Sequence, residues 1–212
     1  MRLNTAELVE RAAGLAIDAA RSGEARVLGI TGPPGAGKST LAAALADGMA
    51  PGTAVVVGMD GFHLSNKVLE AHGSRGRKGA IDTFDDAGYA ALIDRIAGRP
   101  LGGPPVYAPE FRREIEEPIA AGTAVTGEPL VITEGNYLLA PSGAWPAARA
   151  RMAEVWYIDL PDAERLRRLV ARHHAFGKPL PDAEAWACGT DQRNADLIAT
   201  TRDAADLVVD WV

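Results

Sequence analysis

The sequence predicts an α/β fold, in which a parallel sheet of about five strands lies between two layers of helices. The first observation is a set of five short, almost continuous apolar runs, typical of strands that are buried on both faces. They span residues 26–31, 53–59, 129–133, 154–160 and 206–211. The second observation is that longer segments with helical periodicity separate most of these runs. Such alternation favours parallel strands joined by crossover helices.

The spacing of apolar residues predicts an amphipathic leading helix over residues 5–22. Further helices are predicted over 38–49, about 86–98, 144–152, 162–176 and 182–200. The segment 60–128 differs from the rest, since it is rich in Gly and Pro and contains a possible short hairpin near 115–126. We interpret it as an acceptor-binding insertion within a single domain of residues 1–212.

A phosphate-binding loop follows the first strand. Residues 32–39 read Gly-Pro-Pro-Gly-Ala-Gly-Lys-Ser, which is a complete G-x-x-x-x-G-K-[ST] pattern between a strand and a helix. Backbone N–H groups of such a loop surround phosphate oxygens, Lys38 reaches the β- and γ-phosphates, and Ser39 holds Mg²⁺. The sequence therefore predicts binding of a nucleoside triphosphate, ATP with Mg²⁺, by Gly32, Pro34, Gly35, Ala36, Gly37, Lys38, Ser39 and Thr40.

Two acidic residues at strand ends indicate the chemistry of this loop. Asp60 directly follows the strand at 53–59, where a carboxylate can activate or orient an acceptor hydroxyl. Glu134 ends the strand at 129–133 and is a candidate for the Mg²⁺ surroundings or the acceptor. The Asn/Thr-Lys-x-Asp motif of GTPases is absent from the sequence, and no apolar strand ends in Asp-Glu as in motor ATPases. A small-molecule kinase is the favoured class.

A group of arginines predicts a lid. Arg165, Arg168 and Arg172 are spaced i, i+3, i+7 on one helix face, ahead of a Gly177-Lys178-Pro179 break. Such a helix can close on the transferring phosphate and neutralise its charge, so we assign residues 162–180 to a lid. The alternative for this group is a solvated basic face. His173 and His174 are assigned to the lid or the surface.

Composition restricts the partners. The formal net charge is −6, which argues against a nucleic-acid or anionic-membrane partner, although basic residues cluster at 75–78 and 165–172. The chain lacks any apolar stretch of 18 residues, and its single cysteine, Cys188, is expected to be small and buried. We expect a cytoplasmic protein.

Together these segments resemble the uridine kinase, pantothenate kinase and phosphoribulokinase group. The resemblance covers residues from about 26 to 210, and it is nearest to a bacterial branch of nucleoside/nucleotide kinase-like proteins that are labelled fructose transport system kinases. It rests on the P-loop and on Met59-Asp60-Gly61-Phe62-His63, Arg77-Lys78-Gly79, Pro105-Val106-Tyr107, Glu134-Gly135 and Thr201-Arg202-Asp203-Ala204-Ala205-Asp206.

The resemblance implies a P-loop NTPase fold and roles for individual residues. Asp60 would activate the acceptor near Mg²⁺, with Ser39 and Glu134 completing the metal surroundings. The acceptor pocket would contain His63, Lys78, Tyr107, Arg112 and Arg113. The three lid arginines and Lys38 would act on the transferred phosphate, and a homodimer is allowed by analogy.

The acceptor itself stays open. A sugar such as fructose follows from the label of the branch, whereas a nucleoside or pantothenate is the alternative. Aromatic residues that could stack on a base (Phe84, Tyr107, Phe111) and acids that could bind a sugar (Asp60, Asp82, Asp85, Glu134) are both present. A regulatory protein that binds nucleotide without transferring phosphate is the alternative of another class.

Overall fold

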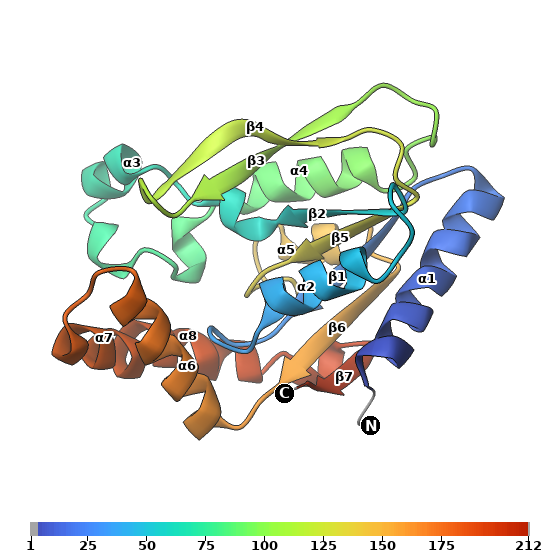
Figure 1. Cartoon of the computed structure of the whole chain (residues 1–212). Coiled ribbons are helices and arrows are strands. Elements are labelled where there is room, and N and C mark those ends of the chain that lie inside the picture. Colours follow the sequence, from blue (N-terminus) through green and yellow to red (C-terminus); the bar gives the residue numbers. More distant parts are fainter. Residues whose placement is uncertain (1–3, 212) are drawn as a thin grey trace.

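A five-stranded parallel sheet forms the centre of the computed structural model, which describes residues 4–211 (Figure 1). Its strand order is β2-β5-β1-β6-β7, and every neighbouring pair is parallel. The strands are β1 (Arg26–Thr31), β2 (Ala54–Gly58), β5 (Leu130–Glu134), β6 (Glu154–Asp159) and β7 (Leu207–Asp210). The five predicted strands and the α/β class are therefore confirmed.

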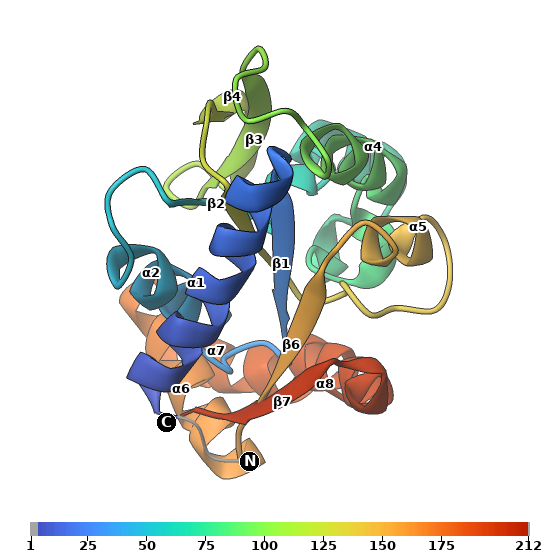
Figure 2. The same cartoon turned by 90° about the vertical axis from the view of Figure 1, so that its right-hand side faces the viewer.

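Helices cover both faces of this sheet, as Figure 2 shows. On one face lie α1 (Thr5–Ser22) and α2 (Lys38–Asp47), and on the other lie α4 (Asp86–Ile96) and α5 (Trp145–Arg149). Successive residues of a strand point to opposite faces. Leu28 accordingly packs with the α1 and α2 side chains, while Val27 packs with those of α4 and α5.

The first helix has clear signals at both ends. Asn4 and Glu7 form a reciprocal capping box, in which each side chain accepts the other residue's backbone N–H. The helix stops at Gly23, whose φ of 73° is left-handed and whose N–H donates to Ala19 O. These signals explain why the predicted bounds of 5–22 agree with the structure.

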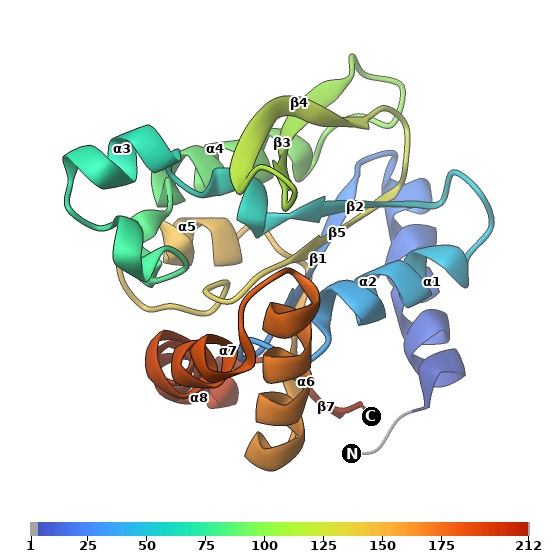
Figure 3. The same cartoon turned by 60° about the vertical axis from the view of Figure 1, so that its left-hand side comes forward.

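The segment after β2 carries short helices and a hairpin that extend beyond the sheet (Figure 3). It comprises η1 (Met59–Phe62), α3 (Asn66–Ala71), η2 (Arg75–Arg77), η3 (Ile81–Thr83), α4, and antiparallel β3 (Val106–Arg112) and β4 (Glu117–Val125). The hairpin predicted near 115–126 was placed too late. Its first strand holds Pro109, which has no N–H to donate, and the register shifts there between Ala108 and Glu110.

The C-terminal part forms a second group of helices at the same end of the sheet. It contains α6 (Asp162–Ala175), α7 (Leu180–Trp186), the π-helical turn η4 (Ala187–Asp191), α8 (Gln192–Ala199) and η5 (Arg202–Ala204). The helix predicted over 182–200 is present as a continuous helical run from 180 to 199, with a π turn within it. Cys188 lies in this turn and is exposed, contrary to expectation. No helix within residues 4–211 is long and apolar enough to cross a bilayer.

The packing of the hairpin on η1 can be tested at Gly61. A Cβ at this position would lie 2.3 Å from the carbonyl oxygen of Pro109, so the backbone would have to move. We expect Gly61→Ala to lower the free energy of unfolding in urea by about 1–3 kcal/mol.

Gly76 is the control for this substitution. It lies in the same insertion and faces open space. Gly76→Ala should change the free energy of unfolding by less than about 0.5 kcal/mol. Equal effects of the two substitutions would contradict the packing described.

Candidate active site

A cavity of about 630 Å³ lies at the carboxyl ends of β1, β2 and β5. In an open parallel sheet this edge is where ligands bind. The P-loop and α6 form one side of the cavity, while η1, η2 and the end of β3 form the other. Figure 3 shows these two groups of elements facing each other across the end of the sheet.

The P-loop is fixed against the lid helix. Gly35 has a left-handed φ of 85°, and a Cβ there would lie 2.7 Å from Leu169 Cγ of α6. Pro34, Gly35, Gly37, Lys38, Ser39 and Thr40 line the cavity, whereas Ala36 is fully buried beneath the loop. The loop thus has the shape that a phosphate chain requires, with its N–H groups at the start of α2.

Lys38 is buried in this loop with unused hydrogen-bonding capacity. Its Nζ donates to the carbonyl oxygens of Gly32 at 2.9 Å and Pro33 at 3.2 Å. An ammonium has three N–H donors, so one is left for a ligand. Burial lowers the pKa of Lys38 from 10.5 to about 8, although the charges of Glu134 and Asp60 oppose this effect. An anion bound next to Nζ would therefore stabilise the charged form of Lys38.

Ser39, Glu134 and Asp60 bring oxygen atoms to the same place. Ser39 Oγ donates to Glu134 Oε1 at 3.1 Å. Burial raises the pKa of Glu134, and the neighbouring Asp60 charge adds to the effect. A hydroxyl and one or two carboxylates fit Mg²⁺, which takes its remaining ligands from water and phosphate. Residues 4–211 hold no cluster of three His, Cys, Asp or Glu side chains that could bind a metal alone.

An aromatic group forms the opposite side of the cavity. The His63 ring lies between Phe84 and Phe111, with centroid distances of 4.1 Å and 4.7 Å. His63 Nδ1 lies 2.8 Å from the carbonyl oxygen of Asp60, and because a carbonyl only accepts, Nδ1 carries the proton. Burial lowers the pKa of His63, so the ring is neutral at pH 7 and its Nε2 can accept a hydrogen bond.

Arg113 and Lys78 also reach the cavity from this side, as the resemblance implied. Arg113 Nη2 lies 3.7 Å from Asp60 Oδ2. The other two acceptor candidates lie outside the cavity. Tyr107 is 56% exposed, and Arg112 is exposed and pairs with Glu114 at 3.7 Å. Tyr107 faces outward because it alternates with the buried Val106 and Ala108, and after the register shift beyond Ala108 the exposed positions of β3 are Glu110 and Arg112.

The lid arginines separate into two roles. Arg168 and Arg172 line the cavity, and burial lowers the pKa of Arg172, with nearby Arg113 adding to the effect. Within residues 4–211, Arg172 has no carboxylate within 4 Å. Arg165 was predicted to contact phosphate, but its side chain is fully buried, bonded to Asp162 at 2.9 Å and to Gln192. It lies two turns before Arg172, where α6 supports the P-loop.

Several cavity residues had not been predicted. Asn136 follows Glu134 by two positions, and Arg75 belongs to the basic cluster at 75–78, so both carried a weak signal. Trp186, Asp191 and Asn194 lie in what periodicity presents as ordinary helix. Asp191 Oδ2 is 2.7 Å from His173 Nε2, which places His173 in the cavity wall. His174 bonds to the backbone oxygen of Lys178.

Known proteins share this architecture and sequence. The ATP-dependent kinase-like protein notR' of Aspergillus versicolor is 35% identical over 153 residues, which cover 68% of this chain and 88% of that protein. The chain therefore belongs to the ATP-dependent P-loop kinase-like family. A crystal structure from Silicibacter sp. TM1040, provisionally named a fructose transport system kinase, has a TM-score of 0.86 and 34% identity, covering 99% of this chain and 100% of that one.

Two further matches support the fold of this kinase-like protein. YFH7 of Saccharomyces cerevisiae, a P-loop protein at 18% identity, gives a TM-score of 0.83 and covers 98% of this chain and 99% of that one. Residues 6–60 also match the family described as methylmalonyl-CoA mutase-associated GTPase MeaB. That span contains the P-loop but ends where the other side of the cavity begins.

Arg172 allows a test of the lid. We expect Arg172→Gln to weaken binding of Mg-ATP at least tenfold, because a cation that lines the cavity beside the P-loop is lost. Isothermal titration calorimetry measures this change.

Arg167→Gln is the control, since Arg167 lies on the same helix but does not line the cavity and pairs with Glu164. Its Kd should stay within about twofold of the wild type. A loss of affinity that is the same in both variants would contradict a specific role for Arg172.

Proposed function

We propose that this protein transfers the γ-phosphoryl group of ATP to a hydroxyl group of a small metabolite. The observation that carries the proposal is the position of Asp60. It lies in η1, directly after β2, and lines the same cavity as Lys38 and Glu134 of the phosphate side and His63 of the aromatic side. A regulatory protein that only binds nucleotide does not need the aromatic side of this cavity.

The transfer can be written for these residues. The acceptor hydroxyl lies in line with the γ-phosphorus, and Asp60 accepts its proton as the oxygen attacks. The new bond joins the acceptor oxygen to phosphorus, and the bond from phosphorus to the bridging oxygen of ADP breaks. Arg113 next to Asp60 holds the carboxylate in place, and ADP leaves with the electron pair of the broken bond.

Charge neutralisation comes from the P-loop and the lid. Lys38, Arg168 and Arg172 converge on the cavity from these two elements, and they would carry the charge that develops on the phosphoryl oxygens. Ser39, together with Glu134 and Asp60, would hold Mg²⁺, which would supply Lewis-acid polarisation of the phosphate. Residues 60–128 would bind the acceptor, and residues 162–180 would act as the lid.

The acceptor can be identified by testing a panel of candidate compounds. A sugar, either free like fructose or carrying an anionic group, is our first candidate, because carboxylate, amide and imidazole groups in the cavity suit a polyhydroxy compound. A nucleoside or pantothenate is the second. ADP release from Mg-ATP is measured with sugars, sugar derivatives, nucleosides, vitamins and glycerate. An acceptor-dependent signal supports the proposal, and slow release that no acceptor changes supports a regulatory protein instead.

Asp60 tests the proposed mechanism directly. Asp60→Asn keeps the shape of the side chain but cannot take up the proton. We expect kcat to fall at least about 10²-fold while the Kd of Mg-ATP changes less than about threefold.

Asp82→Asn is the matched control, because Asp82 lies in the same insertion, is half-exposed and pairs with Arg77. It should leave kcat unchanged within about twofold. Full turnover in the Asp60→Asn variant would remove Asp60 from the mechanism.

A further inference from the structure

We propose that the phosphoryl acceptor is an anion, a hydroxy compound that carries a carboxylate or phosphate group, and that Lys78 and Arg75 bind that group. This inference rests on the proposed kinase function and specifies its substrate class.

The charge of the cavity differs from the charge of the whole chain. The chain has a formal net charge of −6. Its cavity, however, is lined by seven Lys and Arg residues and only four acidic residues. The cations are Lys38, Arg75, Lys78, Arg113, Arg168, Arg172 and Lys178, and the acids are Asp60, Glu116, Glu134 and Asp191. A surplus of positive charge at this one place indicates anionic ligands.

ATP accounts for only part of this surplus. Lys38 belongs to the P-loop, and Arg168 and Arg172 belong to α6, so these three cations lie on the phosphate side. Arg113 already has Asp60 as a partner at 3.7 Å. Arg75 and Lys78 come from η2 and its C-terminal boundary, in the insertion that forms the opposite side of the cavity. They are available to the acceptor rather than to the nucleotide.

Lys78 is held in place by neutral groups alone. Lys78 is only 9% exposed, and its Nζ donates hydrogen bonds to Asn66 Oδ1 at 2.8 Å and to the carbonyl oxygen of Glu116. The Phe111 ring centroid lies 5.1 Å from the same nitrogen. Within residues 4–211 no carboxylate lies within 4 Å of it, and the third N–H of the ammonium is left for a ligand.

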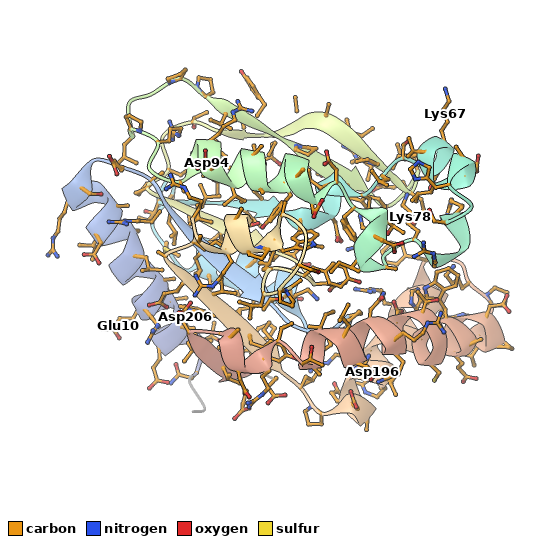
Figure 4. All side chains as sticks on the ribbon, turned by 180° about the vertical axis from the view of Figure 1, so that it is seen from behind. Glu10, Lys67, Lys78, Asp94, Asp196 and Asp206 are labelled. Atoms are coloured by element: carbon orange, nitrogen blue, oxygen red, sulfur yellow. The ribbon has the colours of Figure 1, made fainter. Side chains whose placement is uncertain are left out.

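Burial therefore destabilises the charged form of Lys78, and a bound anion would offset this cost. The pKa of Lys78 is lowered by desolvation, although the nearby Glu117 charge opposes this. In Figure 4 Lys67 of α3 points outward, whereas Lys78 lies among the side chains of the insertion, where its Nζ contacts Asn66 and Glu116. A buried cation without a charged partner is unfavourable unless a ligand supplies one.

Arg75 adds a second cation three residues earlier. It is half-buried, lines the same cavity, and has no side-chain hydrogen bond or ion pair in the described part of the chain, residues 4–211. A guanidinium can bind a carboxylate or phosphate through two parallel hydrogen bonds. A neutral sugar or nucleoside would leave both cations without an ion-pair partner, so the geometry favours an acceptor with its own negative charge.

The first test compares acceptors that differ in charge. ADP release is measured with glycerol, glycerate and glycerol 3-phosphate, with fructose and fructose 6-phosphate, with pantothenol and pantothenate, and with uridine and UMP. We expect the active member of each series to be the anion. Comparing the carboxylates with the phosphates of the panel then shows which of the two groups the site binds. A neutral member that is used as well as its anionic counterpart would overturn the inference.

Variants assign the effect to Lys78. Lys78→Gln keeps much of the side-chain length and removes the charge, so KM for the anionic acceptor should rise at least tenfold while kcat changes less than about threefold. Lys67→Gln, on the exposed face of α3, should leave KM unchanged. Equal KM values for Lys78→Gln and the wild type would contradict the assignment.

The second test does not depend on catalysis. With Mg²⁺ and a non-hydrolysable ATP analogue filling the nucleotide site, binding of inorganic phosphate is measured by calorimetry. We expect wild type and Lys67→Gln to bind it alike, and Lys78→Gln and Arg75→Gln to bind it at least tenfold more weakly. Thermal melting checks that each variant is folded.

The two readouts separate the two claims. Phosphate binding that depends on Lys78 without ADP release from any acceptor would contradict the kinase function and leave the anion site in place. No phosphate binding, or binding that neither substitution changes, would overturn the anion site even where an acceptor is phosphorylated.

Discussion

The burial of one ammonium group, that of Lys38, is the constraint on which the rest of this site depends. A pKa lowered from 10.5 to about 8 means that the folded protein holds this charge at a cost of about 3 kcal/mol near neutral pH. Between pH 8 and 10.5 the unfolded chain binds more protons than the folded one, so stability without nucleotide rises with pH in this window. A triphosphate removes the cost, because it supplies the charge that the loop lacks.

The sheet order explains why the partners of Lys38 are present. β5 lies between β1 and β2, so the P-loop, Glu134 and Asp60 emerge side by side at one edge although they are far apart in sequence. The insertion and the lid then meet across this edge. Asn194 Nδ2 donates to the backbone oxygen of Gly79 at 3.2 Å, and Tyr137 OH donates to the same oxygen at 2.7 Å. The cavity thus lies where the insertion and the C-terminal helices are hydrogen-bonded to each other at the end of the sheet.

The sequence predicted those parts of the site that local sequence patterns determine. The P-loop, Asp60 and Glu134 were found because each follows an apolar strand, and parallel strands bring such residues to one edge. Tyr107 was misplaced because it was assigned by resemblance alone, whereas the alternation of β3 turns Val106 and Ala108 inward and Tyr107 outward. Arg165 shares a helix face with Arg172, but only packing against Gly35 shows that it supports the loop. Asp191 was missed because the helical pattern over 182–200 does not reveal the π turn in which it lies.

The most direct measurement of the central claim is the number of protons taken up when Mg-ATP binds. It is obtained by calorimetry in buffers of different ionisation enthalpy at pH 7 and pH 9. At pH 9 most free protein has a neutral Lys38, and the bound phosphate requires the ammonium, so uptake should be close to one proton, with little at pH 7. No difference in proton uptake between the two pH values would contradict the account, since Lys38 would then carry its charge with or without the nucleotide.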